Sequence, residues 1–152
     1  MNNVSIVPTS SFHLDELADN MRPADLKEIW CLSKRKTRDT LQMSVDISAR
    51  VDTCLIDGSV AAVWGIAPFA SFGIPWMLGT PLINAHPKVL IAESKRQLRL
   101  MLNDYDHLQQ WVDIRNKASV RWLKKLGFTF HEAIPYGMDG ELFYPFEYRK
   151  HV

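Results

Sequence analysis

The sequence is poor in cysteine, and its two cysteines form no metal-binding pattern. Cys31 and Cys54 lie far apart, with no CxxC pair and no histidine at a ligand spacing from either. Zinc sites are built from such closely spaced pairs, so we expect no metal site. Two isolated cysteines are typical of small buried apolar residues in a reducing compartment.

Long apolar runs and an excess of charge of one sign are also missing. No apolar stretch approaches the length of a membrane span, and the first residues lack the basic-then-apolar pattern of a signal peptide. The net charge is only +1. We therefore expect a cytoplasmic protein with no membrane partner and no nucleic-acid partner.

The apolar content is high enough for one sizeable core. Of the 152 residues, 47% are hydrophobic, which predicts a single domain over residues 1–152. The clearest local signal is the pair Asp57-Gly58 between two runs of β-forming residues, which predicts a tight hairpin. Periodicity and turn residues predict strands at 4–7, 54–56, 60–66, 74–79, 110–114, 129–133 and 142–148, and helices at 12–18 (capped by Ser11), from Pro23 onward, at 37–49, at 87–102 and at 116–126.

The stretch NKASVRWLKKLGFTF, residues 116–130, is the most informative part of the sequence. Asn116 can cap a helix through its side-chain oxygen, and Gly127 suits the left-handed residue that ends one. Val120, Leu123 and Leu126 share the inward face. These features alone predict an amphipathic helix that runs directly into a strand, with or without a function.

The combination of motif and element order resembles the GNAT acyltransferase superfamily. An Asn, a small residue three positions later and Leu-Gly-Phe at the helix end are similar to the fourth-helix signature of that superfamily. The resemblance covers most of the chain. It implies an α/β fold with a mixed, mostly antiparallel sheet and helices on both faces, and acetyl-CoA as the cofactor if the protein is catalytic.

Several stretches resemble a narrower group of phage-encoded GNAT-like proteins that includes the internal virion protein A of T7-like podoviruses. This resemblance implies a bacteriophage setting, in the host cytoplasm or in association with the virion. It implies other phage or host proteins as partners. The stretches are MRPAD with EIW, GIPWMLGT, HP, VDIRN and PYG.

The segment matching the pyrophosphate loop of the superfamily departs from its pattern. Such a loop is rich in glycine, because the backbone N–H groups must approach the phosphates closely. Residues 81–88 contain no glycine, and Pro87 lacks an N–H. His86 and Lys88 could still bind an anion, although His86-Pro87 is also an ordinary helix start.

The superfamily's proton donor is missing as well. Many members have a Tyr seven residues after the Asn, and here that position is Leu123. Tyr136 and Tyr144 are alternative donors on the last strands, and Glu93 is one of several possible bases. Nothing in their spacing selects any of them.

Two further clusters have both a functional and a structural interpretation. Trp76, Met77 and Leu78 belong to an apolar segment that could line an acyl or pantetheine groove, or form a buried core strand. Residues 115–125 carry five positive charges and no negative one. Asn116 and Arg121 could contact CoA there, although a solvated helix face explains the charges too.

The sequence thus leaves two classes of function open. The glycine-free loop and Leu123 favour a non-catalytic or catalytically degenerate GNAT-fold protein that acts in virion morphogenesis or as a binding protein. The alternative is an acetyl-CoA-dependent N-acyltransferase with an atypical pyrophosphate loop, since fold alone does not fix function.

Overall fold

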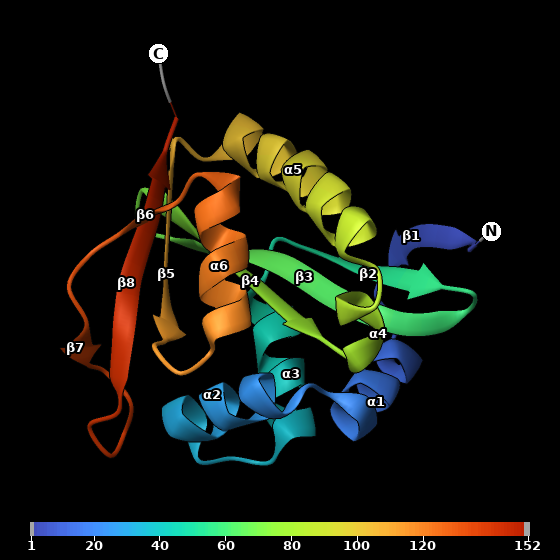
Figure 1. The fold of residues 1–152 in the computed structure, drawn as a ribbon, viewed down its shortest axis with the longest axis horizontal. Coiled ribbons are helices and arrows are strands. Elements are labelled where there is room, and N and C mark those ends of the chain that lie inside the picture. The colour runs from blue at the N-terminus through green and yellow to red at the C-terminus, as the bar shows by residue number, and fades with distance from the viewer. Residues whose placement is uncertain (1, 151–152) are drawn as a thin grey trace.

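The computed structural model describes residues 2–150, which form one continuous sheet with helices on both faces (Figure 1). The strand order is β1-β2-β3-β4-β5-β8-β6, and β7 pairs with β8. All pairs are antiparallel except β4 with β5. The elements are β1 (Val4–Pro8), α1 (Ser11–Asn20), α2 (Pro23–Ser33), α3 (Thr37–Ile47), β2 (Arg50–Ile56), β3 (Ser59–Phe69), β4 (Phe72–Gly79), α4 (Pro81–Asn84), α5 (Pro87–Asp104), β5 (His107–Asp113), α6 (Lys117–Leu126), β6 (Thr129–Phe130), β7 (Ile134–Pro135) and β8 (Leu142–Arg149).

The predicted hairpin is confirmed, and it turns at Asp57 and Gly58. Both residues have positive φ, +52° and +83°, which is the backbone of a tight turn between twisted strands. The pairing of β2 with β3 shifts register between Cys54 and Leu55. The predicted fold class, a mixed and mostly antiparallel sheet with helices on both faces, is also confirmed.

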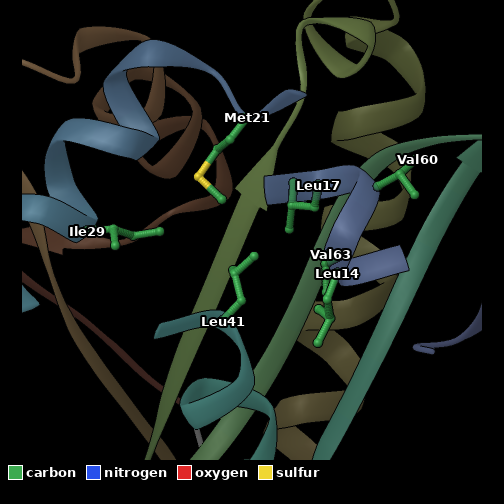
Figure 2. Close-up of a cluster of buried hydrophobic side chains, with 7 residues drawn as sticks. All are labelled: Leu14, Leu17, Met21, Ile29, Leu41, Val60 and Val63. Carbon is green, nitrogen blue, oxygen red and sulfur yellow. The ribbon is translucent and has the colours of Figure 1, made fainter. Parts of the chain in front are cut away.

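Helices α1, α2 and α3 cover one face of the sheet and share a core with β3. Leu14, Leu17 and Leu41 are at most 2% exposed in this cluster (Figure 2). Burying each such side chain contributes about 1.5–3 kcal/mol, so the cluster fixes the helices firmly to the sheet. Ser10 caps α1, not Ser11 as predicted, because the Ser10 hydroxyl accepts from the His13 amide.

Helices α5 and α6 cover the opposite face, where the apolar residues of α5 pack against the core, namely Leu90, Leu98, Met101 and Leu102. Two polar residues of α5, Ser94 and Gln97, are buried more deeply than these. The indole of Trp122 on α6 donates to the Ser94 hydroxyl over 2.9 Å and joins the two helices. Polar side chains are therefore buried where α5 crosses the sheet.

The second half of the chain shows two further departures from prediction. The short helix α4 follows β4 directly and was not predicted, since four residues are too few for a periodic pattern. The strand predicted at 129–133 is limited to β6 at its start, and a further short strand that was not predicted, β7, pairs with the same partner β8. A separate observation concerns membranes: over residues 2–150 no helix has the length and apolar character to cross one.

Candidate functional site

The sheet splits between its two parallel strands. β4 and β5 share a single paired position, Gly73 with Leu108, and diverge beyond it. Pro75, the next residue of β4 that faces β5, has no N–H to continue the ladder. Gln110 reaches across the opening instead, and its Nε2 donates to the Pro75 carbonyl over 3.2 Å.

A cavity of about 230 Å³ fills this split and reaches both faces of the sheet. On one side it is lined by residues of α2 and α3, and on the other by residues of α5 and α6. The strands contribute Trp76 and Met77 from β4 and Trp111 from β5. The split therefore connects the two faces of the sheet through one continuous cavity.

Side-chain oxygens accept hydrogen bonds from most of the backbone N–H groups that face the split. Gly79 N–H donates to Asp25 over 2.9 Å, and Asp113 N–H donates to Glu28 over 3.0 Å. Trp111 N–H donates to the Oε1 of Gln110 over 3.0 Å. Backbone groups of a strand alternate in direction, so Met77 N–H points into the split like that of Gly79. Among the described residues it has no acceptor, which makes it the free donor on the β4 edge.

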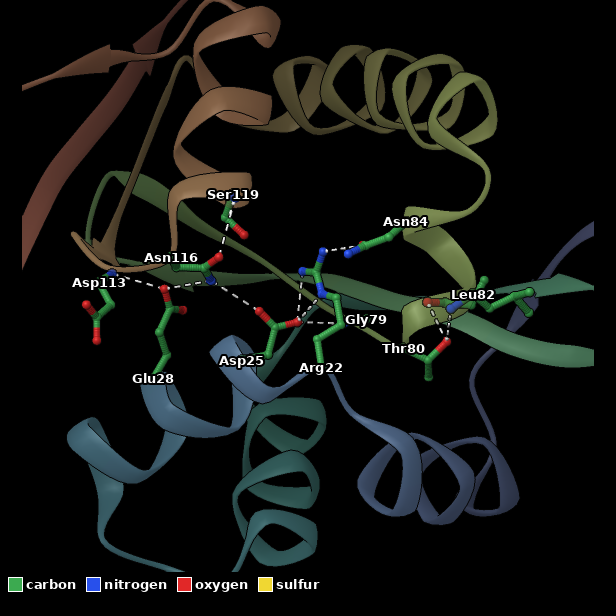
Figure 3. Close-up of polar contacts among 11 residues, drawn as sticks. Arg22, Asp25, Glu28, Gly79, Thr80, Leu82, Asn84, Asp113, Asn116 and Ser119 are labelled. Atoms are coloured by element: carbon green, nitrogen blue, oxygen red, sulfur yellow. Dashed lines mark hydrogen bonds and ion pairs between the residues drawn. The ribbon is translucent and has the colours of Figure 1, made fainter.

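Asp25 is a fully satisfied carboxylate at one end of the split. Its Oδ2 lies 2.9 Å from Nε and 2.8 Å from Nη2 of Arg22, and it also accepts from Gly79 (Figure 3). The same guanidinium also contacts Asn84: Nη1 of Arg22 donates to Oδ1 of Asn84 over 3.0 Å. Asp25 is 1% exposed. A charge buried to this extent must be paired and hydrogen-bonded, and that of Asp25 is.

Glu28 lies one helical turn from Asp25 and has a different environment. Its Oε1 accepts from Asp113 N–H and, over 3.1 Å, from Nδ2 of Asn116. No described residue donates to Oε2, which is not among the fully covered side-chain atoms and so meets the cavity. Burial, reinforced by the nearby negative charge of Asp25, raises the pKa of Glu28 from 4.5 to about 8. Such a carboxyl can exchange a proton with a ligand near neutral pH.

Asn116 connects the two carboxyl groups and starts α6. Its Nδ2 donates to Oδ1 of Asp25 over 3.3 Å and to Glu28, while its Oδ1 accepts from Ser119 N–H over 3.4 Å. The predicted capping role is therefore confirmed, and so is the left-handed stop at Gly127, with φ +97°. Leu123, predicted to lie in the core or a groove, is 6% exposed and lines the cavity.

In the segment that connects β4 to α5, backbone N–H groups donate to acceptors within the segment itself. Thr80 caps α4: its hydroxyl accepts from Leu82 N–H over 3.3 Å, and its carbonyl accepts from Ile83 N–H over 3.2 Å. The amides of Ala85 and His86 also donate to carbonyls of this segment. Pro81 and Pro87 have no N–H, so the first turn of α5 leaves only Lys88 and Val89 as its unpaired donors. A pyrophosphate finds few of the convergent amides it needs here.

Solved acetyltransferase structures share this architecture. Ard1 from Thermoplasma volcanium superposes with a TM-score of 0.77 at 15% identity, covering 98% of this chain and 99% of that one. A GNAT-family acetyltransferase from Streptococcus pneumoniae gives 0.66 at 15% identity, covering 98% and 100%. YncA from Salmonella typhimurium, solved with its cofactor acetyl-CoA, gives 0.67 at 16% identity, covering 97% and 94%. The chain has the GNAT acetyltransferase fold. No family model and no curated protein matches the sequence itself.

Within the GNAT fold, the candidate cofactor residues separate into two groups. Trp76, Met77 and Leu78 all line the cavity in the split. His86 does not: its ring bonds the Leu82 carbonyl and the Asn2 amide. Lys88 and Arg121 are exposed outside the cavity, on the first turn of α5 and the outer face of α6.

None of the three candidate catalytic residues of the sequence lines the cavity of this GNAT fold. Glu93 forms an ion pair with Arg96 over 2.9 Å. Tyr136 stacks on Trp111 with ring centroids 4.5 Å apart, and burial raises the pKa of its phenol. Tyr144 packs edge-on against Phe130.

Glu28, the carboxyl group that lines the cavity with a free oxygen, was missed by the sequence analysis. It lies on α2 within the stretch DLKEIW, where its charge is typical of an exposed helix position. Its partners Asp113 and Asn116 lie 85 and 88 residues away in the chain. The available signal was the resemblance of EIW and VDIRN to one group of proteins, because those two stretches meet at this site.

Proposed function

We propose that the protein is an N-acyltransferase that transfers an acyl group from a thioester such as acetyl-CoA to an amine, with Glu28 as the general base. The observation that carries this proposal is the free Oε2 of Glu28 in the same cavity as the free N–H of Met77. One group accepts a proton and the other donates a hydrogen bond, which are the two functions that aminolysis of a thioester needs.

The residues have distinct roles in this reaction. In its ionised form, which is the major form only above about pH 8, Glu28 takes a proton from the ammonium group of the acceptor and so releases the nitrogen lone pair. Met77 N–H stabilises the negative charge that develops on the carbonyl oxygen. A C–N bond replaces the C–S bond, and the thiol leaves with the second proton of the nitrogen. Leu123 supplies no proton, but a thiol has a pKa of about 8.5, so the departing sulfur needs no acid other than the nitrogen whose second proton it takes.

The fit to acetyl-CoA differs between the two ends of that molecule. The split can hold a thioester and its pantetheine arm, because it is open and keeps one free backbone donor. The β4–α5 connection offers the pyrophosphate little, as its amides are occupied. We therefore expect catalysis to depend on positioning in the split rather than on binding of the nucleotide.

Thiol release from acetyl-CoA tests the proposal. The protein is incubated with acetyl-CoA and a panel of amines that contains hexylamine, phenethylamine and spermidine. We expect thiol release above the uncatalysed rate with at least one amine, and a loss of about 10²-fold or more in Glu28→Gln. Glu132→Gln, an exposed position, is the matched control. No release with any amine would refute the function, and an unaffected Glu28→Gln would refute the base.

A second proposal is that the protein is a non-catalytic GNAT-fold component of phage assembly that binds phage or host proteins in the host cytoplasm. The observation in its favour is the set of occupied amides after β4. It predicts no thiol release and millimolar or weaker acetyl-CoA binding. A calorimetric dissociation constant below about 10 μM would exclude it.

A further inference from the structure

The part of the cavity that lies on the α2 and α3 side of the sheet, next to Glu28, is called the chamber below. Leu32 at its rim is 39% exposed, so this chamber opens to solvent. Trp111 belongs to this side because Leu108 and Val112, its alternating neighbours on β5, pack in the α6 cluster. The chamber walls are Ile29, Leu32, Thr40, Ser44, Trp76 and Trp111.

The polar hydrogens of these walls are already donated to acceptors or covered by protein atoms. The Thr40 hydroxyl donates to Ser33 over 3.2 Å, and the Ser44 hydroxyl donates to the Thr40 carbonyl over 3.1 Å. The indole of Trp76 donates to Ser48 over 2.8 Å. The indole N–H of Trp111 is fully covered by protein atoms. The chamber thus presents an apolar surface to a ligand.

One ionisable group faces this apolar surface with a free atom. Asp25 is saturated by Arg22, Gly79 and Asn116, which leaves Oε2 of Glu28. A ligand with one ammonium group finds one acceptor for it. A second ammonium would leave water without a second carboxylate to pair with, and only the neutral hydroxyl oxygens of Thr40 and Ser44 could accept from it, which opposes binding.

We propose that the acceptor substrate is a primary monoamine with an apolar body, rather than a polyamine or an aminosugar. This inference rests on the proposed function and adds the acceptor class to it. The ammonium group meets Glu28 and the apolar body lies against Leu32, Trp76 and Trp111. Polyamines and aminosugars are rejected because the chamber has no second charged group to pair with their additional polar groups.

Hexylamine and cadaverine form a matched pair of probes. They have the same number of heavy atoms, and cadaverine has an ammonium where hexylamine has a methyl group. Thiol release from acetyl-CoA is measured for each amine. We expect kcat/KM for hexylamine to exceed that for cadaverine by about 10²-fold or more. Equal values would overturn the inference and leave the acyltransferase function intact.

A charge added at the rim provides a second test. Leu32→Glu places a carboxylate on the exposed edge of the chamber and should shift the hexylamine-to-cadaverine ratio toward cadaverine by about tenfold. Leu142→Glu, at an exposed position of β8 outside the chamber, should leave the ratio unchanged. A ratio that moves equally in both variants would show that the chamber does not select the amine.

A measurement of amine binding distinguishes a failure of the monoamine inference from a failure of the proposed acyltransferase function. If neither amine releases thiol, acyl transfer to these amines is refuted, and calorimetric titration of the protein with each amine replaces turnover. Tighter binding of hexylamine would then support the chamber as a monoamine site. Equal or tighter binding of cadaverine would overturn it.

Discussion

Asn116 donates to Glu28 over 3.1 Å, although 88 residues separate them in the chain. The same amide nitrogen reaches Asp25, so one side chain holds the start of α6 against two carboxyl groups of α2. The residue that caps the helix is therefore also the residue that orients the candidate base. Local helix stability and the geometry of the site depend on a single amide.

Replacing Asn116 by Asp tests this double role. The variant keeps an oxygen to cap α6 but exchanges the donor for a third carboxylate beside Asp25 and Glu28. One hydrogen bond to the Asp25 carboxylate, worth about 1.5–3 kcal/mol, and one to the protonated Glu28, worth about 0.5–1.5 kcal/mol, are lost, so we expect a destabilisation of about 2–4.5 kcal/mol. Urea unfolding measures it. A variant as stable as the wild type would show that the amide does not hold the carboxyl groups.

The raised pKa of Glu28 predicts how stability varies with pH. The folded protein keeps this proton up to about pH 8, whereas the unfolded chain loses it near pH 4.5. The unfolded state therefore binds fewer protons in this window, and the contribution of Glu28 is lost as the pH rises. Glu28→Gln removes the effect, so its stability relative to wild type should increase with pH by at least about 1.4 kcal/mol.

Urea unfolding at the two ends of that pH window gives the comparison. Glu132→Gln carries the same chemical change at an exposed position and serves as the control. A constant difference between Glu28→Gln and wild type would mean that Glu28 is ionised throughout the window.

The occupied amides after β4 predict a weak dependence on the nucleotide of CoA. We expect kcat/KM for S-acetylpantetheine to be within about tenfold of that for acetyl-CoA, because few hydrogen bonds reach the pyrophosphate. Lys88→Glu should change neither value by more than the same factor. A loss of about 10³-fold with the shorter donor would reveal a pyrophosphate site around Lys88 and Val89.

The burial of Leu123 predicts a cost in stability when its side chain is shortened. It is buried beside Val120 and Leu126, so Leu123→Ala should lower the free energy of unfolding by about 2–5 kcal/mol. Thermal or urea unfolding measures this loss. Leu142→Ala, at an exposed position, should cost about 0.5 kcal/mol or less. Equal effects of the two variants would contradict the burial of Leu123.

The sequence was most informative where a local motif sets the backbone. Asp57-Gly58 predicts its hairpin and Asn116 predicts its helix start, because each acts on residues within four positions. Glu28 could not be found in this way, since its environment comes from segments far along the chain. Ser94 and Gln97 were missed because periodicity marks only the apolar residues of a face, and these two polar residues lie on the buried face of α5, Ser94 midway between Leu90 and Leu98.

The paired donors along the split have a consequence for self-association. A sheet that opens in its middle presents two inner strand edges, and an unpaired edge is a template for a foreign strand and hence for aggregation. Here Asp25, Glu28 and Gln110 already bind the edge amides of Gly79, Asp113 and Trp111. Pro75 offers an intruding strand no donor at all. The side chains that shape the cavity therefore also protect the open sheet from edge-to-edge association.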